Sequence, residues 1–207
     1  MNPLLVPILA LAGLLAGRGQ RAVIARYAPA GPPRLTAEIT TAVLLGALAA
    51  RVHPGLLLAA ACWLAVCAVP LAFIDAAVQR LPDPLTAAAF AGTALLLLAA
   101  AAVGGQWHAL TVAILGGVAL TGFYLLLMLI NPGGMGMGDV KTAASAGTVL
   151  AWSGWPVLIA GGIAGFLLAA VCGIALLATG RVTRKQHIPF GPFMLAGAFA
   201  VILAWHL

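Results

Sequence analysis

The chain has 207 residues, of which 64% are hydrophobic and only 7% are charged. A soluble domain carries about a quarter charged residues and roughly half apolar ones, so this composition excludes a soluble globular protein. The formal charge of +6 does not indicate nucleic-acid binding, because the basic residues sit in short loops between apolar runs. The composition indicates a protein that crosses the lipid bilayer several times.

Eight apolar segments follow one another along the chain. They cover residues 3–17, 36–51, 55–74, 84–103, 109–130, 139–153, 156–178 and 190–206. Their length and their alanine and leucine content favour helices, which satisfy their own backbone hydrogen bonds in lipid. Several are shorter than the roughly 20 residues of a straight span, which local thinning of the bilayer accommodates. The sequence therefore predicts an all-α fold, a polytopic transmembrane helix bundle of about eight spans in a single membrane-embedded domain, residues 1–207.

The basic residues predict how this bundle is oriented. If all eight segments cross, one side receives nine basic residues and the other side receives only Arg51. The nine are Arg18, Arg21, Arg26, Arg34, Arg80, Lys141, Arg181, Arg184 and Lys185. By the positive-inside rule the side with nine is cytoplasmic and both termini face outward. We expect a multi-pass protein of the cell (inner) membrane. Residues 18–35, which hold four arginines and a run of prolines and glycine, are predicted to be a short cytoplasmic connector.

Three cysteines, Cys62, Cys67 and Cys172, lie inside apolar segments and form no CxxC pair. They are interpreted as small packing residues, and neither a metal site nor a cofactor is predicted.

Two aspartates are the candidate functional residues. Asp75 lies at the end of the third apolar segment, and Asp139 follows the glycine-rich run that begins at Asn131. A carboxylate beside a membrane segment is costly, which makes it a functional-site candidate. The predicted topology places both at the cytoplasmic level. If they lie close together they share a proton, so that one can take a proton from water while the other polarises a carbonyl oxygen, as in peptide hydrolysis without a covalent intermediate.

Several of these residues also have structural interpretations. An aspartate at a helix N-terminus, such as Asp139, caps free N–H groups. Asp75 lies near a helix C-terminus, where the helix dipole disfavours a negative charge. Its structural interpretation is pairing with Arg80 or with water. Lys141 either sets the topology by snorkelling or supports the two carboxylates or the substrate carbonyl. The glycines before Asp139 either allow special backbone conformations or permit close approach of a substrate or helix.

Residues 136–141, Gly-Met-Gly-Asp-Val-Lys, resemble the GxGD motif of intramembrane aspartyl proteases, which presenilins and signal peptide peptidases share. The wider context resembles the type IV prepilin peptidases. Residues 73–75, Phe-Ile-Asp, followed by Leu-Pro-Asp at 81–83, are similar to that family's first-aspartate segment. Residues 188–193, Ile-Pro-Phe-Gly-Pro-Phe, are similar to its C-terminal signature, and Glu38 is placed like a glutamate common near the second span.

The resemblance implies a membrane aspartyl endopeptidase in which Asp75 and Asp139 form the catalytic pair. Its substrates would be type IV prepilins or pilin-like secretion subunits, single-span membrane proteins whose short basic leader the family removes at the cytoplasmic face. The implied contributors to substrate binding or to the loop are Gly136, Gly138, Lys141 and Glu38. Longer members carry a cytoplasmic domain with paired CxxC motifs after the first span and also N-methylate the product. Here residues 18–35 stand in its place, so the chain resembles the short form and we expect no methyl transfer.

The alternative function is a small proton- or cation-coupled transporter that uses Asp75 and Asp139. Charges at the bilayer midplane and an internal repeat would favour it, whereas both acids lie at one predicted face and the sequence shows no repeat. A purely structural membrane scaffold would leave the two acidic motifs unexplained.

Overall fold

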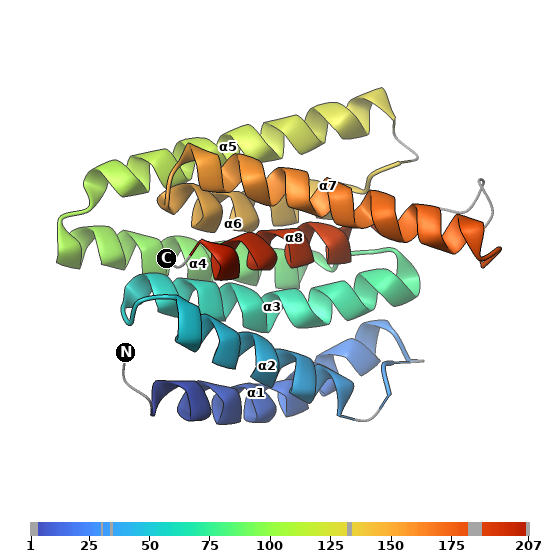
Figure 1. The fold of residues 1–207 in the computed structure, drawn as a ribbon, viewed down its shortest axis with the longest axis horizontal. Helices are drawn as coiled ribbons and strands as arrows, with labels where there is room; N and C mark the ends of the chain where they lie inside the picture. Colours follow the sequence, from blue (N-terminus) through green and yellow to red (C-terminus); the bar gives the residue numbers. More distant parts are fainter. Residues whose placement is uncertain (1–3, 30, 34, 132–133, 182–187, 206–207) are drawn as a thin grey trace.

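A computed structural model describes residues 4–29, 31–33, 35–131, 134–181 and 188–205. The described residues form eight helices and no strand. These are α1 (Leu5–Tyr27), α2 (Thr36–Arg51), α3 (Leu56–Val78), α4 (Asp83–Gly104), α5 (Trp107–Ile130), α6 (Met137–Trp152), α7 (Trp155–Ala178) and α8 (Gly191–Ala204). The helices run broadly along the long axis of the molecule, and α1 begins at the same end at which α8 finishes (Figure 1). The predicted all-α helix bundle is confirmed.

Five of the helices, α1, α3, α4, α5 and α7, are long and apolar enough to cross a membrane. The other three are shorter: α2 and α6 have 16 residues each and α8 has 14. At about 1.5 Å per residue, 16 residues span about 24 Å, less than the roughly 30 Å of a bilayer core. The chain is thus a multi-pass membrane protein, while the number of spans, eight, stays a prediction.

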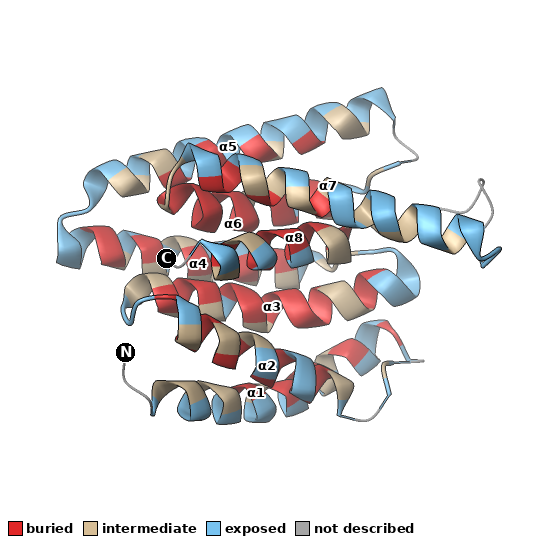
Figure 2. Ribbon diagram, in the orientation of Figure 1, coloured by how far each residue is buried: buried red, intermediate tan, exposed pale blue. Residues whose placement is uncertain are grey.

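The helices that carry the two aspartates lie at the centre of the bundle. α3 and α6 each have 12 buried residues, more than any other helix, whereas α1 and α7 have four each. Figure 2 shows buried residues concentrated on α3 and α6, and exposed ones on the outer faces of α1, α5 and α7. The exposed side chains of α5 and α7 include many Leu, Ile and Val residues, which suits a face in contact with lipid. The polar helix α6 is therefore shielded from lipid by its neighbours.

The first helix is longer than its apolar segment. We expected a span ending at residue 17 and a connector over residues 18–35, but α1 continues to Tyr27. Arginine and glutamine are good helix formers, and the first proline of this stretch, Pro29, comes only after the helix has ended. Only residues 28–35 connect α1 to α2, and the basic side chains at 18, 21 and 26 project from a helix.

Two glycines determine how closely α8 packs against α7. A Cβ atom built on Gly197 of α8 would lie 2.3 Å from the backbone nitrogen of Gly165 in α7. Only glycine permits this contact between two helix backbones. The contact places α8, and with it the residue that begins α8, Gly191, next to the central helices.

Candidate active site

Asp75 and Asp139 converge on one backbone position, Gly191. A Cβ atom built on Gly191 would lie 2.8 Å from Oδ2 of Asp75 and 3.2 Å from Oδ1 of Asp139. These two distances bring the carboxylate oxygens to within about 6 Å of each other. The two side chains are only 5% and 6% exposed. Residues that are 64 positions apart in the sequence thus form one buried pair of carboxylates.

Asp139 is the third residue of α6, and its position follows from how that helix begins. Gly136 is the N-cap, with extended backbone angles, and its N–H group donates to Oδ2 of Asp139 at 3.1 Å. The backbone N–H of Asp139 donates in return to the carbonyl of Gly136 at 3.1 Å. The capping interpretation of Asp139 is therefore correct. The cap uses only Oδ2 of the carboxylate, and Oδ1 faces the site.

Asp75 lies in the last turn of α3, where the helix dipole disfavours a negative charge. The structure offsets this with the N-terminus of another helix. Gly191, the first residue of α8, donates its backbone N–H to Oδ2 of Asp75 at 3.1 Å. The expected alternative, pairing with Arg80, is absent from the ion pairs of the described residues. The carboxylate of Asp75 thus satisfies an N–H group that α8 itself cannot satisfy.

A proline in α3 creates a polar contact that holds the helix just before Asp75. Pro70 has no N–H, so it cannot donate to the carbonyl of Val66 four residues earlier. The Nε2 group of Gln20 from α1 donates to that carbonyl instead, at 2.8 Å. Thr41 of α2 donates its hydroxyl to Oε1 of Gln20 at 2.7 Å. Three helices are joined at this point, and Gln20 is 5% exposed.

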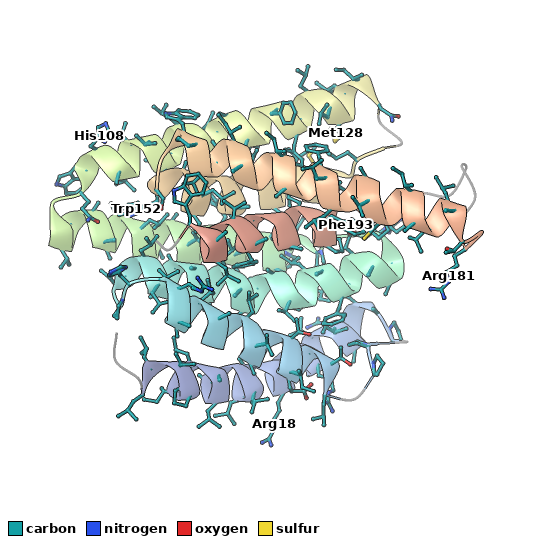
Figure 3. The ribbon with its side chains drawn as sticks, in the orientation of Figure 1. Arg18, His108, Met128, Trp152, Arg181 and Phe193 are labelled. Atoms are coloured by element: carbon teal, nitrogen blue, oxygen red, sulfur yellow. The ribbon has the colours of Figure 1, made fainter. Side chains whose placement is uncertain are left out.

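The carboxylate pair faces a cavity of about 1200 Å³. Its walls come from the ends of α1 and α3, the loop between α3 and α4, the beginning of α6 and the residues before α8. Asp75, Arg80, Asp83, Asp139 and Lys141 supply its charged lining. A cavity of this size can hold an extended peptide segment. It lies at the end of the bundle where Arg181 projects, opposite the end that carries His108 and Trp152 (Figure 3).

Lys141 lines this cavity but is not directed to the carboxylate pair. Its Nζ atom lies 2.6 Å from Oδ1 of Asp83 at the start of α4. Both side chains are exposed, so the ion pair contributes little to stability. Lys141 therefore joins α6 to α4 at the rim of the cavity. From this position it can contact a bound peptide but not the carboxylate pair.

Glu38 lies apart from the cavity. It is 3% exposed on α2 and forms an ion pair with Arg21 of α1. Gly17 of α1 packs directly against it, since a Cβ on that glycine would lie 2.4 Å from Cα of Glu38. Glu38 is not among the described residues that line the cavity, so its contacts are those of α1 with α2.

The two glycines of the GxGD run differ in their surroundings. A Cβ on Gly138 would lie 2.5 Å from Cβ of Leu81, so glycine is needed for the α3–α4 loop to pack on α6. A Cβ on Gly136 would meet its nearest neighbour, Oδ2 of Asp139, at an ordinary 3.7 Å. Neither has a positive φ. Close approach, and not an unusual backbone conformation, is thus the reason for Gly138; Gly133 lies outside the described residues.

Sequence reasoning did not identify Gly191 as a contact of Asp75. The signal was present in the C-terminal signature, residues 188–193, but a proline at the second position of α8 also fits an ordinary helix start. Only the packing of α8 shows that the preceding glycine meets both carboxylates. Tyr124 of α5, which is fully buried against Phe190, gave no signal in the sequence.

Comparison with known proteins identifies the family of the chain. Residues 58–178, which include both aspartates, match the type IV leader peptidase family. The chain belongs to this family. No solved structure matches the chain.

Three curated relatives illustrate the match. All three are named prepilin leader peptidase/N-methyltransferase. The Aeromonas hydrophila protein is 32% identical over 183 residues, covering 82% of this chain and 60% of the relative. The Burkholderia pseudomallei (strain 1026b) protein is 35% identical, with 78% and 51% covered. The Neisseria gonorrhoeae protein is 29% identical, with 81% and 56% covered. The chain therefore spans about half to three-fifths of the length of these relatives.

Proposed function

We propose that this chain is a membrane aspartyl endopeptidase that removes the short basic leader from type IV prepilins or pilin-like secretion subunits. The observation that carries the proposal is the pair of buried carboxylates, Asp75 and Asp139, which meet beside Gly191 in a cavity large enough for a peptide. Membership of the leader peptidase family supports the substrate class. The whole chain acts as one membrane-embedded peptidase domain.

In the proposed reaction the two carboxylates have complementary roles. The ionised carboxyl takes a proton from water as the water oxygen attacks the scissile carbonyl carbon. The protonated carboxyl donates a hydrogen bond to the carbonyl oxygen, which carries the developing negative charge. The proton taken from water then passes to the amide nitrogen as the C–N bond breaks, giving a carboxylate and a new N-terminal amine. Backbone N–H groups from Gly136 and Gly191 fix the direction of the two side chains during these steps.

The position of the cavity supports cleavage at the cytoplasmic face. The described basic residues at 21, 26, 80, 141 and 181 belong to the half of the bundle in which the cavity lies, and the positive-inside rule makes that end cytoplasmic. A substrate with one apolar helix can keep that helix in lipid while its leader enters the cavity. The apolar helix then presents the leader to the carboxylates.

Purified protein reconstituted in lipid and incubated with a prepilin-type substrate tests the proposal. Mass spectrometry should find one cut between the leader and the apolar helix. The same leader without its apolar helix should be cut with a much lower kcat/KM, because presentation then fails. An intact full-length substrate after incubation with folded protein would refute the peptidase function. Equal kcat/KM for both substrates would refute presentation by the membrane.

The transporter alternative gains no support from the position of the acids. Asp75 is three residues from the end of α3 and Asp139 is the third residue of α6, so both lie at one end of the bundle. A carrier site needs its charges near the middle of its helices. The rim ion pair between Lys141 and Asp83 lies at the same end.

A further inference from the structure

Tyr124 of α5 is a buried polar residue that the proposed reaction does not use. Its side chain is 0% exposed, and its hydroxyl has no hydrogen-bond partner among the described residues. The same is true of one oxygen of the carboxylate pair, Oδ1 of Asp139. A polar group left unpaired in the interior costs free energy, so two such atoms in one region require an explanation.

The ring of Tyr124 belongs to an aromatic cluster that reaches the start of α8. Its centroid lies 5.6 Å from that of Phe190 and 5.7 Å from that of Phe166. Phe190 is the N-cap of α8 and immediately precedes Gly191, the position at which both carboxylates meet. A Cβ atom built on Gly191 would lie 3.2 Å from Oδ1 of Asp139, the unpaired carboxylate oxygen. The two unpaired atoms therefore belong to the same buried region at the junction of α5, α6 and α8.

We propose that Tyr124 is a positioning residue of the site, whose hydroxyl donates a hydrogen bond through one water molecule to Oδ1 of Asp139. The proposal rests on the proposed function for its effect on catalysis. Gly136 already holds Oδ2 of Asp139, so a second donor at Oδ1 fixes the plane of the carboxylate. A hydrogen bond to an ionised carboxylate is stronger than one between neutral groups.

The competing explanation is that Tyr124 only fills space in the aromatic cluster. Phenylalanine would serve that purpose equally well, and removing an unpaired buried hydroxyl would be neutral or stabilising. The two explanations thus predict opposite effects of Tyr124→Phe, a substitution that keeps the ring contacts with Phe166 and Phe190. Phe166→Leu is the matched control, because it loosens the same cluster and leaves the hydroxyl in place.

The kinetic test compares Tyr124→Phe with the unaltered protein on a prepilin-type substrate. We expect kcat to fall on the order of 10-fold or more with KM unchanged, since misplacing a reacting group costs up to about 10²-fold. Phe166→Leu should lower thermal stability without this selective loss of kcat. An unchanged kcat in Tyr124→Phe, or a loss shared equally by Phe166→Leu, would overturn the positioning role.

A double-mutant cycle on Tm tests the contact without relying on peptidase activity. Tyr124→Phe should lower Tm by about 2–4 °C in the unaltered protein, the shift expected for losing one buried hydrogen bond in a chain of this size. In an Asp139→Ala background the same substitution should have almost no effect. Equal shifts in both backgrounds would overturn the hydrogen bond. If Asp75→Asn retained full cleavage, the proposed function would fail. The double-mutant cycle would still show whether Tyr124 and Asp139 interact.

Discussion

Each carboxylate of the pair uses Oδ2 to accept a backbone N–H at the start of a helix. For Asp139 the donor is Gly136 at the start of α6, and for Asp75 it is Gly191 at the start of α8. Both carboxyl groups therefore lie where a helix dipole favours a negative charge, although α3 alone would disfavour one on Asp75. This arrangement fixes the direction of both side chains while one oxygen of Asp139, Oδ1, stays unpaired among the described residues.

Replacing either aspartate by asparagine separates chemistry from structure. Asn keeps the shape of the side chain, and its carbonyl oxygen can still accept the N–H of Gly136 or Gly191. It cannot take the proton of the attacking water, so we expect Asp75→Asn and Asp139→Asn each to lower cleavage by at least about 10²-fold. The double variant should be scarcely worse than either single one, because the two groups act as a unit.

The measurement is cleavage of a prepilin-type substrate in membranes that contain matched amounts of each variant. Tm measured in parallel serves as the control for folding and should change little. Near-normal turnover in either single variant would remove that aspartate from the catalytic pair and revive the transporter alternative.

The two GxGD glycines give a second prediction, in which each serves as the control for the other. Gly138→Ala forces a Cβ atom into Leu81 and should displace the start of α6, and Asp139 with it. A misplacement of about 1 Å at a reacting group costs on the order of 10²-fold in rate. Gly136→Ala meets only ordinary contacts and should retain activity within a few-fold. Cleavage rates of the two variants, normalised to protein in the membrane, should show a much larger loss for Gly138→Ala than for Gly136→Ala. Equal losses would contradict this prediction.

Some site residues were predictable from the sequence and others were not. Asp75 and Asp139 stand out because a carboxylate at the edge of an apolar segment is rare and costly. Lys141 and Glu38 lie in similar sequence contexts, yet their partners, Asp83 and Arg21, are set by how separate helices pack. Local patterns carry no information on such pairing, and the same holds for the buried position of Tyr124.

At the level of helices, hydrophobic runs predicted the elements and their order but not all of their boundaries. The apolar segment of α1 ends at residue 17, whereas the helix ends at Tyr27, because backbone hydrogen bonds continue through polar residues. In α6 hydrophobicity is a poor guide to burial. Its hydroxyl-bearing residues lower its hydrophobicity, yet it is among the most buried helices. Thr142 donates its hydroxyl to the carbonyl of Gly138 at 2.9 Å, which lets a polar side chain be buried within the bundle.

The contact between Gln20 and α3 gives a prediction for one helix. Gln20→Leu leaves the carbonyl of Val66 without a donor, because Pro70 cannot supply one. Interhelical hydrogen bonds in membranes contribute about 1–2 kcal/mol in peptide systems. For a chain of this size that loss lowers Tm by about 2–8 °C. Thermal unfolding in detergent measures this shift. The cleavage rate should also fall, because Asp75 lies five residues beyond the proline.

The double variant Gln20→Leu/Pro70→Ala is the control for this prediction. Alanine at position 70 restores an N–H that can donate to the carbonyl of Val66 within α3 itself. It should recover most of the lost Tm. A double variant that is less stable than Gln20→Leu alone would show that the proline, and not the bridging glutamine, determines the stability of this turn.

For the whole molecule, the two ends of the bundle differ in charge, and the candidate site lies at one of them. The site, its cavity and the described basic residues other than Arg18 and Arg51 share one end. The chain turns at the other end between α4 and α5 and between α6 and α7 (Figure 1). The sequence predicted this asymmetry by counting basic residues, because the positive-inside rule depends on loop composition alone.

Single cysteines in a background without Cys62, Cys67 and Cys172 test which end is cytoplasmic. Gly134→Cys lies in an exposed turn at the cavity end, and Gln106→Cys lies in an exposed turn at the opposite end. A membrane-impermeant thiol reagent added to intact cells should label position 106 and leave position 134 unlabelled until the membrane is opened. The reverse pattern would place the cavity outside the cell and contradict cleavage at the cytoplasmic face.

The contact between Gly191 and Asp75 links the last helix of the described chain to the third across 116 positions. The chain leaves the ribosome N-terminus first, so α3 and α6 enter the membrane while α8 is still being synthesised. Until α8 docks through Gly165 and Gly197, Asp75 has no amide from Gly191 to hold it, and the wall formed by residues 188–190 is absent. A nascent chain therefore holds both aspartates before it holds the complete site. On the proposed function, cleavage can therefore begin only after α8 has docked, and the first seven helices alone do not form an active peptidase.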